Sequence, residues 1–391
     1  MQTLEQITGQ QRDSGCLETA SFEFSSSRMT LLANGVRRVL AEPGCCPRQL
    51  PRSVLAMLAE RSRMTEAGSI VVGAIPFDDR SVCQLYVPAS YRFVRRELPR
   101  DGIVPAASVI ASMREVTDER QYKSAVSEAL SLMSSTELRK VVLSRSIDIE
   151  ADAALDVRAM VDALRDRNPQ AYVFAVPTIG GGTLLGASPE LLLRKKDDVV
   201  VSNPLAGSRP RPANAADEAA VIDELMASDK DRREHALVVE AVAAGLSPFC
   251  RTLDVPEAPE VIRTSSMLHL STRIEGRLAD PEVSSLEMAL ALHPTPAVCG
   301  TPCDLARSAI SRLEGYCRDQ YCGVVGWMDA RGDGEWAVSI RCGLLKQNGM
   351  RLYAGAGIVD GSEPDSEWDE TTAKLNTMLD VFGLRPANDA S

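Results

Sequence analysis

Glycines, carboxylates and a single lysine are concentrated between residues 353 and 379, where the sequence reads YAGAGIVDGSEPDSEWDETTAKLNTML. Gly355 and Gly357 fall in a predicted strand, where a residue without a Cβ lets the main chain approach a ligand. Residues 367–379 have helical spacing and contain no Gly or Pro. Glu367, Glu370 and Lys374 recur at i, i+3 and i+7, on one face of that helix. They could bind a ligand, or form a solvated face, since carboxylates in a first helical turn also suit the helix dipole.

A lysine and a glutamate stand where burial would make them reactive. Lys140 begins a predicted strand over residues 140–147, a position at which lysine is usually solvated. Glu190 interrupts the apolar run GASPELLL. Desolvation of its carboxyl would raise the pKa and favour a proton donor near neutral pH, whereas an exposed position at a strand end would leave it ordinary.

A further carboxylate, Glu234, lies in a predicted helical region over residues 217–246, which is one long helix or two joined ones. Apolar residues at i+3, i+4 and i+8 put Glu234 in line with a buried stripe, where an unpaired anion would be costly. Glu234 therefore requires a metal ion, a cation, or a structural salt bridge with a neighbouring arginine.

The alternation of a predicted strand over residues 335–345 places Arg341 on the same face as Ala337, Ser339 and Gly343. This arrangement leaves room for an anionic ligand and suits bidentate capture of a carboxylate. His269 lies in another predicted strand, over residues 265–274, where a histidine is more often a satisfied sheet residue than a ligand.

The remaining pattern indicates strands that pair through short turns. Paired strands are predicted over residues 68–88 and over 172–176 with 183–186, and a meander over 323–329, 335–345 and 351–359. Helices are predicted after a Thr117 cap and after a Thr301 cap followed by Pro302.

Length and composition allow a large folded core, because the chain has 391 residues, of which 45% are hydrophobic and 25% are charged. A net charge of -11 argues against nucleic-acid binding. The sequence has no apolar run of the ~20 residues that a membrane helix needs and no signal-peptide pattern, which predicts a cytoplasmic protein.

The 10 cysteines lack a regular spacing, which is typical of reduced and mostly buried thiols. The pairs Cys299/Cys303 and Cys317/Cys322 have spacings that zinc sites permit. Zinc is nevertheless disfavoured, because Cys303 falls inside a predicted helix and the chain has only 3 histidines.

A series of ordered blocks carries a resemblance to a known family. They are GAIPFD from residue 73, KVVLSR from 140, GASPELLLRK from 186, PLAGSRPR from 204, DRREHALVVEA from 231, LHPTPAVCGTP from 292, GVVGWMD from 323, VSIRC from 338, YAGAGIV from 353 and EWDETTAKL from 367. From about residue 68 to 384 the chain resembles the chorismate-utilising enzymes, and within them the isochorismate synthases of siderophore pathways.

The resemblance implies an α+β fold in which two large, mostly antiparallel β-sheets stack as a sandwich, with helices outside and the active site in a deep cleft. It implies a chorismate-binding catalytic domain over residues 68–391, with residues 1–67 as a variable N-terminal segment packed on that domain.

The resemblance also implies roles for individual residues. Lys140 matches the general base that activates water for attack at C2 of chorismate, and Glu190 matches the acid that protonates the departing C4 hydroxyl. Glu234 and Glu370 match ligands of Mg²⁺, with Glu367 nearby through water. Positions around the substrate are matched by Ser208, His269, Thr295, Arg341, Gly355, Gly357 and Lys374, with the two glycines acting through backbone N–H groups.

The lysine also separates branches of the family. Relatives that add ammonia carry a different residue where Lys140 stands and use a glutamine amidotransferase partner, so water is the expected nucleophile here and no such subunit is expected. Salicylate synthases have the same lysine and then eliminate pyruvate, which makes them the alternative. The expected protein is a monomeric, Mg²⁺-dependent isochorismate synthase.

Overall fold

The computed structural model describes residues 21–40, 50–62, 68–78, 81–96, 110–179 and 181–384. Within these ranges the strands of the first half are β1 (Ser21–Ser25), β2 (Met29–Leu40), β3 (Ile70–Ile75), β4 (Gln84–Arg95), β5 (Ile110–Glu115), β6 (Lys140–Ala151), β7 (Tyr172–Pro177), β8 (Thr183–Ser188), β9 (Leu191–Lys196) and β10 (Val199–Asn203). Those of the second half are β11 (Leu205–Pro210), β12 (Cys250–Asp254), β13 (Glu260–Arg263), β14 (Met267–Ser271), β15 (Ile274–Leu278), β16 (Gly300–Thr301), β17 (Val324–Asp329), β18 (Gly334–Val338), β19 (Cys342–Lys346) and β20 (Gly349–Val359).

One hydrogen-bonded network contains 17 of these strands, and β11, β14 and β13 form a separate sheet of 3. Neighbours in the network pair antiparallel in the order β5, β6, β20, β19, β8, β7, β1, β2, β4, β3, β17, β18, β9, β10, β15 and β12, and β16 pairs with the start of β6.

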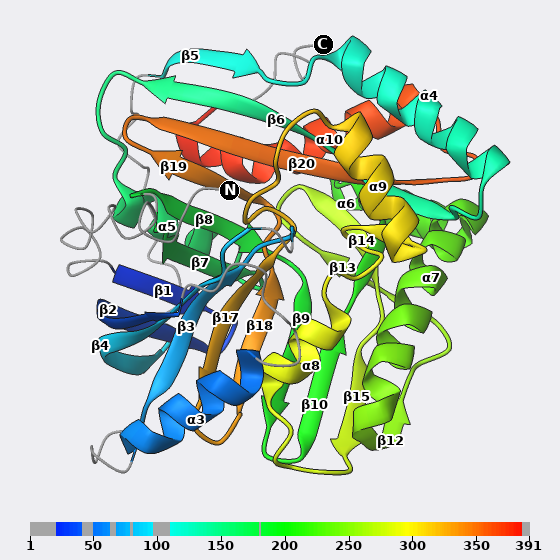
Figure 1. The fold of residues 1–391 in the computed structure, drawn as a ribbon. Helices are drawn as coiled ribbons and strands as arrows, with labels where there is room; N and C mark the ends of the chain where they lie inside the picture. The colour runs from blue at the N-terminus through cyan, green and yellow to red at the C-terminus, as the bar shows by residue number, and fades with distance from the viewer. Residues whose placement is uncertain are drawn as a thin grey trace, which may run out of the picture.

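The network bends into two halves whose strands run in different directions. In Figure 1, β6, β20 and β19 cross the upper part of the molecule, whereas β17, β18, β9 and β10 run nearly upright below them. The predicted α+β class and the mostly antiparallel sheets are confirmed, and the two predicted sheets are the two halves of this one network.

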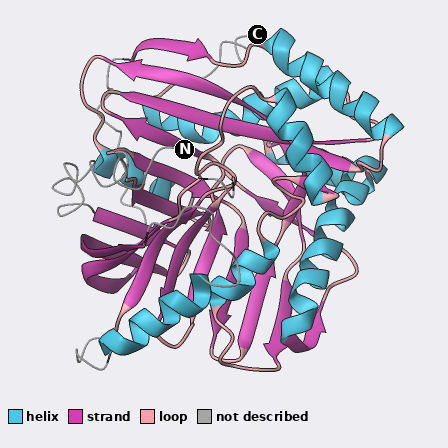
Figure 2. Ribbon diagram, in the orientation of Figure 1, coloured by secondary structure: helices cyan, strands magenta, loops and turns pink. Residues whose placement is uncertain are grey.

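Helices lie on the outside of the strands (Figure 2). They are α3 (Leu50–Ser62), α4 (Glu119–Ser135), α5 (Val157–Arg167), α6 (Ala215–Ala227), α7 (Asp229–Leu246), α8 (Ser285–Leu292), α9 (Cys303–Leu313) and α10 (Pro364–Leu379), with 3-10 turns η2 (Ser247–Phe249) and η3 (Asp380–Phe382). Helix α10 packs on β20 and α4, α5 packs on β7 and β8, and α9 packs on β6. The sequence predicted one long helix or two joined helices over residues 217–246. The structure has two, α6 and α7, which meet at Ser228.

The period of two along β20 sorts its apolar side chains into two buried clusters. On β20, Leu352 and Ala354 pack into a cluster with residues of α5 and α10, while the intervening Tyr353 belongs to the larger cluster on the other face. Both faces of this part of the sheet are thus buried, which holds β20 and its neighbour β6 rigidly in place.

Three predicted helix starts were wrong by a few residues. The cap of α4 is Asp118, whose side chain accepts a hydrogen bond from the Gln121 backbone N–H, and not Thr117. Helix α9 is capped at Pro302, while Thr301 belongs to β16. Helix α10 begins at Pro364 and not at residue 367. Proline is well suited to a first helical turn, because its missing N–H is not needed there.

The predicted strand over residues 335–345 was also wrong, because the chain breaks between β18 and β19. Arg341 has φ 50, a left-handed conformation that is rare for a residue with a Cβ. Strand β18 pairs with β17 and β9, whereas β19 pairs with β20 and β8. The break at Arg341 therefore carries the chain from the lower half of the network to the upper half.

The described part of residues 1–67 is joined to the rest of the network. Strand β1 pairs with β7, and β2 pairs with β4. The division of the chain into an N-terminal segment and a catalytic domain at residue 68 stays a prediction.

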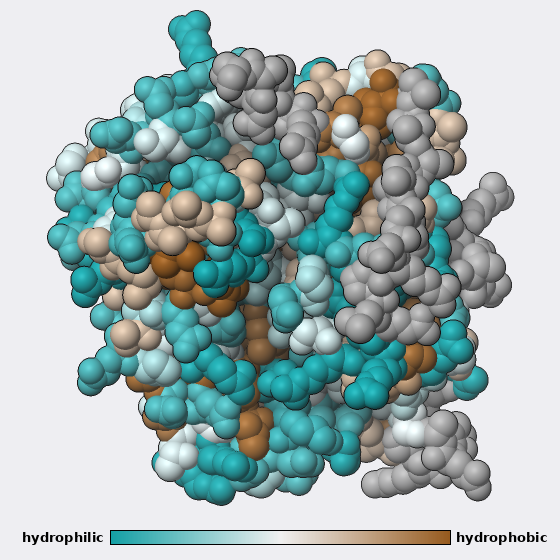
Figure 3. Space-filling view, turned by 180° about the vertical axis from the view of Figure 1, so that it is seen from behind, coloured by the Kyte–Doolittle hydropathy of each residue, from teal (hydrophilic) through white to brown (hydrophobic). Residues whose placement is uncertain are grey.

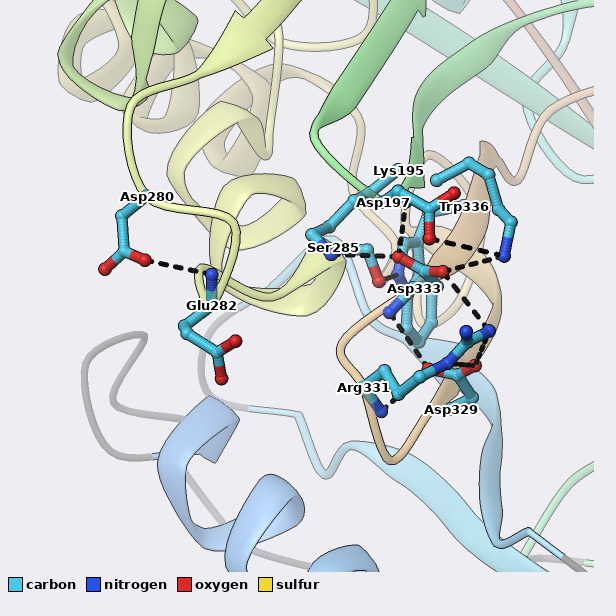
Figure 4. A network of polar contacts seen from close by, with 10 residues as sticks. Lys195, Asp197, Asp280, Glu282, Ser285, Asp329, Arg331, Asp333 and Trp336 are labelled. Atoms are coloured by element: carbon cyan, nitrogen blue, oxygen red, sulfur yellow. Dashed lines mark hydrogen bonds and ion pairs between the residues drawn. The ribbon is translucent and has the colours of Figure 1, made fainter.

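A buried charge network anchors the lower end of the strands (Figure 4). Asp333, which is 3% exposed, accepts hydrogen bonds from Lys195 at 2.9 Å, Lys196 at 3.0 Å and the Asp197 backbone N–H at 2.9 Å. Burial alone would raise the pKa of Asp333, but these lysines outweigh it and lower the pKa. The network ties the β9–β10 turn to the β17–β18 turn.

Hydrophilic residues predominate among the described residues on the face seen in Figure 3, where apolar ones appear in small separate groups. No helix in the described ranges is long and apolar enough to cross a membrane. The described free cysteines are Cys250, Cys299, Cys303, Cys317, Cys322 and Cys342. Cys83 is disulfide-bonded, so the expectation of reduced thiols is wrong at that position.

Candidate active site

A cleft is lined by residues of β6 and β20, of the small sheet, and of the links between the two halves of the network. Of the residues that the sequence singled out, it is lined by Glu190, Ser208, Glu234, His269, Arg341, Gly355, Gly357 and Lys374. Lys140 and Glu370 lie directly behind these, each in contact with a lining residue, and Glu367 contacts Lys230. Thr295 instead lines a neighbouring cavity beside Pro294 and Pro296.

Lys140 is held at the start of β6, between two partner strands. Its backbone is paired with Val359 of β20 on one side and with Thr301 of β16 on the other. The side chain is 0% exposed, and its Nζ lies 3.0 Å from Glu234 Oε1. This contact lacks hydrogen-bond geometry, so the buried Nζ retains unused donors. A buried amine with unused donors requires a further partner, such as a ligand.

Gly357 makes room for this pair. A Cβ built on Gly357 would lie 2.1 Å from Glu234 Oε1 and 3.1 Å from Lys140 Cε. Any side chain here would push the carboxylate away from the lysine. The structure thus gives Gly357 a steric role, while the expected use of its backbone N–H on a substrate stays a prediction.

Glu190 lies between β8 and β9, in a wholly desolvated position. Burial raises the pKa of Glu190 to about 8, although Lys140, Lys374 and Arg341 act in the opposite direction. Lys140 is the strongest of these charges. The apolar run around Glu190 predicted a raised pKa, and the structure has it. The Glu190 carboxyl is therefore mostly protonated at neutral pH.

Arg341 reaches the cleft because of its left-handed turn, and not through the strand alternation that the sequence indicated. Its Nη2 lies 3.2 Å from Nε2 of His269. Burial and then the charges of Arg341 and Lys374 lower the pKa of His269, so the ring is neutral and accepts this hydrogen bond at Nε2. Burial also lowers the pKa of Arg341 to about 10, where it remains charged at neutral pH.

Helix α10 contributes an ion pair to the side of the cleft. Lys374 binds the Gly355 carbonyl oxygen at 3.0 Å and pairs with Glu370 one turn earlier on the helix. Ser208 donates a hydrogen bond to Glu370 Oε1 at 2.9 Å. Burial opposes ionisation of Glu370, but Lys374, Ser208 and Lys230 outweigh it and lower its pKa.

Sequence reasoning missed a lysine at the centre of the carboxylates. Lys230 lies one turn before Glu234 on α7, and its Nζ is 2.6 Å from Glu367 Oε1. Burial alone would lower the pKa of Lys230, but Glu367, Glu370 and Glu234 raise it. The i, i+4 spacing to Glu234 was the available signal.

The three carboxylates match the donor chemistry of Mg²⁺, which prefers hard oxygen ligands. Burial, followed by repulsion from Glu370, raises the pKa of Glu367 to about 7, so the two carboxylates together favour an added cation. Within the described residues, however, no three such side chains converge as a preformed metal centre. Each carboxylate faces a lysine instead: Glu234 faces Lys140, Glu367 faces Lys230 and Glu370 faces Lys374. A bound metal would have to displace these contacts.

A second buried network, also missed, supports β6 beneath the cleft. Arg318 donates to the backbone carbonyls of Val142 and Val298 at 2.7 Å and 2.8 Å and pairs with Glu314. Glu314 in turn accepts from both the backbone N–H and the hydroxyl of Ser144 at 2.7 Å. The network fixes the segment of β6 that follows Lys140.

A protein-family comparison matches residues 93–383 to chorismate binding enzymes. This chain belongs to that family.

Two curated relatives in the family cover most of the chain. Isochorismate synthase DhbC of Bacillus subtilis (strain 168) is 41% identical over 376 residues, which cover 94% of this chain and 94% of that protein. Isochorismate synthase EntC of Escherichia coli (strain K12) is 41% identical over 337 residues, which cover 85% of this chain and 86% of that protein.

Two solved structures have the same fold as this chain. DhbC from Bacillus anthracis superposes with a TM-score of 0.89 at 42% identity, covering 95% of this chain and all of that one. Anthranilate synthase component I from Streptococcus pneumoniae TIGR4 superposes with a TM-score of 0.70 at 22% identity, covering 90% of this chain and 92% of that one, which establishes a shared fold alone.

Replacing Gly357 tests whether chorismate turnover depends on the contact between Lys140 and Glu234. Gly357→Ala places a Cβ against Glu234, so we expect chorismate turnover to fall by roughly 10²-fold, as small misplacements near reacting groups do. Gly349→Ala on the same strand is the matched control, because its nearest contact would be an ordinary 3.5 Å. Circular dichroism verifies folding of both variants. Full turnover by a folded Gly357→Ala protein would show that this contact is dispensable.

Proposed function

We propose that this protein is an isochorismate synthase that converts chorismate to isochorismate, with Lys140 as general base and Glu190 as general acid. The observation that carries the proposal is the burial of both groups at one cleft, where Glu190 stays protonated near neutral pH and Lys140 is the strongest charge acting on it. To act in these roles, Glu190 must hold its proton at the working pH, whereas Lys140 must have given its proton up.

In this mechanism, Lys140 takes a proton from water as the water oxygen attacks C2 of chorismate. The ring double bonds shift, the C4–O bond breaks, and Glu190 gives its proton to the departing hydroxyl, which leaves as water. The net change to chorismate is an isomerisation, and the lysine and the glutamate then return to their starting states by proton exchange.

Glu234 controls whether Lys140 can act. A carboxylate 3.0 Å away stabilises the charged ammonium, whereas a base must be a neutral amine. Lys140 is therefore available as a base once Glu234 engages a different cation.

We assign Mg²⁺ as that cation, with Glu234 and Glu370 as ligands and Glu367 nearby. When bound, Mg²⁺ supplies a positive charge that orients the ring carboxylate of the substrate. Arg341 is suited to a second carboxylate, since its guanidinium is charged and buried and His269 orients one end of it. Ser208, Thr295, Gly355, Gly357 and Lys374 complete the proposed binding set. The buried Thr295 hydroxyl, like the Lys140 amine, has no hydrogen-bond partner among the described residues.

The alternative is a salicylate synthase, which would go on to eliminate pyruvate from isochorismate. The proteins named isochorismate synthase that cover most of this chain favour the first assignment. The name of the Bacillus anthracis relative links it to 2,3-dihydroxybenzoate, so we propose that the product here supplies that compound for a catecholate siderophore. We further propose a cytoplasmic monomer that acts without an amidotransferase subunit.

The products distinguish these assignments directly. The protein is incubated with chorismate and Mg²⁺, and isochorismate, salicylate and pyruvate are separated by chromatography. We expect isochorismate without pyruvate release, and loss of turnover when EDTA removes the metal. Salicylate with an equal amount of pyruvate would establish the alternative, and full activity after exhaustive chelation would contradict the metal assignment.

Glu190→Gln tests the acid while keeping its volume. We expect kcat to fall by roughly 10² to 10⁴-fold, because the amide cannot donate the proton to the leaving hydroxyl, while chorismate binding measured by calorimetry is retained. In the wild type, the acid is lost as pH rises through about 8, so kcat should decline above that pH. The variant should lack this decline. A variant with most of the wild-type kcat would assign Glu190 a purely structural role.

A further inference from the structure

Two cysteines flank the short strand β16 and touch each other. The sulfurs of Cys299 and Cys303 lie 3.9 Å apart, and the Cys299 thiol also lies 3.8 Å from the Cys303 carbonyl oxygen. Both residues are free thiols. In the described ranges no third Cys, His, Asp or Glu completes a metal site with them. The contact is therefore between two sulfurs alone.

The geometry brings the pair near to that of a disulfide. A disulfide needs sulfurs ~2.05 Å apart on Cβ atoms ~3.8 Å apart, so sulfurs already in van der Waals contact require a small side-chain rotation or backbone shift. Only Gly300, Thr301 and Pro302 separate the two cysteines in the sequence.

The two cysteines differ in their exposure to solvent. Cys303 is partly exposed and lines a cavity of about 210 Å³ together with Pro294, Pro296 and Gly300. Cys299 is 0% exposed. A small oxidant entering this cavity would meet Cys303 first.

The position of Cys303 also favours the reactive thiolate. It is the first residue of α9, where the helix dipole stabilises a negative charge. A hydrogen bond with Cys299, and then the guanidinium of Arg307 one turn later, lower the pKa of the Cys303 thiol. Cys317 is an exposed cysteine outside the pair. Its pKa is raised instead, and partial burial of its thiol is the largest cause.

We propose that Cys299 and Cys303 form a redox-active dithiol, in which Cys303 is the attacking thiol and Cys299 the resolving one. With a small disulfide as oxidant, the Cys303 thiolate attacks one sulfur, forms a mixed disulfide and releases one thiolate. The Cys299 sulfur then attacks Cys303, the intramolecular disulfide forms, and the second small thiol leaves with the Cys299 proton. The cysteines are oxidised by two electrons and the small disulfide is reduced to two thiols.

Two of the three residues between the cysteines are paired with the strand that begins with Lys140. Gly300 pairs with Val141 and Thr301 pairs with Lys140 across β16 and β6. The carbonyl of Cys299 accepts a hydrogen bond from the Val142 backbone N–H at 2.8 Å, and a Cβ on Gly300 would lie 2.2 Å from the Lys140 carbonyl oxygen. Closing a disulfide across β16 therefore displaces the backbone that positions Lys140, a consequence that rests on the proposed role of Lys140 in catalysis.

The modification is tested on the full chain by mass spectrometry, without reference to activity. The protein is incubated with glutathione disulfide, its remaining thiols are alkylated in denaturant, and it is digested with trypsin. Residues 278–307 contain both cysteines and no internal Lys or Arg, so they form one peptide. We expect this peptide to be lighter by two hydrogens and free of alkyl groups. Recovery of the peptide with both cysteines alkylated, or with glutathione retained on Cys303, would overturn the dithiol.

Two variants sharpen the result. Cys303→Ser should leave Cys299 fully alkylated after the same treatment, because the attacking sulfur is gone. Cys317→Ser removes an exposed thiol outside the pair and should behave as the wild type. If Cys299 were still protected from alkylation in Cys303→Ser, it would react without Cys303, and the proposal would be overturned.

The coupling to Lys140 has its own measurement. We expect oxidation to lower chorismate turnover of the wild type by roughly 10-fold to 100-fold, as a small misplacement of a reacting group does, and dithiothreitol to restore it. Cys303→Ser should keep its turnover throughout. If the disulfide forms and turnover is unchanged, the coupling is wrong while the dithiol stands. If the reduced protein does not turn over chorismate at all, the proposed function is wrong. The mass spectrum still decides whether Cys299 and Cys303 form a disulfide.

Discussion

Exclusion of water from the charged groups of the cleft is the constraint on which the rest of the site depends. Lys140, Glu234, Glu367 and Glu370 are buried or nearly so, and each has an opposite charge beside it. An unpaired buried charge is costly, and an opposite charge beside it offsets that cost. Glu190 differs, since it forms no ion pair with any described residue, and burial is the largest influence on its pKa. One desolvated environment therefore holds several ion pairs and also raises the pKa of a carboxylic acid that has no such partner.

Strand β6 transmits this arrangement from the core to the cleft. Lys140 at its first position faces Glu234, and the Ser144 side chain is held by Glu314. The next residue, Arg145, hydrogen-bonds to Thr371 at 2.8 Å and lies 3.7 Å over the ring centre of Trp368, which ties β6 to α10. Helix α10 carries Glu367, Glu370 and Lys374, so the proposed base and the proposed metal ligand Glu370 are positioned by one connected frame. This connection is also why a change at β16, which pairs with the start of β6, would reach the site.

Local pattern predicted the groups whose setting is decided by their own neighbours in the sequence. The apolar run around Glu190 correctly indicated a desolvated acid, and the stripe on α7 correctly placed Glu234 against buried residues. Arg341 was placed in the cleft for the wrong reason, because a left-handed backbone turn cannot be read from an alternating pattern. Lys230 was missed because its partner Glu367 is 137 residues away in the chain, and such pairs are set by tertiary packing. The joining of the two halves into one network depends on equally distant strand pairs.

Burial keeps Glu190 protonated at neutral pH, and this protonation state can be measured directly. Infrared difference spectroscopy of the wild type against Glu190→Gln isolates the carbonyl band of this one carboxylic acid, and a pH titration follows its ionisation. We expect the band to persist at neutral pH and to disappear with a midpoint of about 8. A band already absent at neutral pH, with a midpoint close to the ordinary glutamate value, would contradict it.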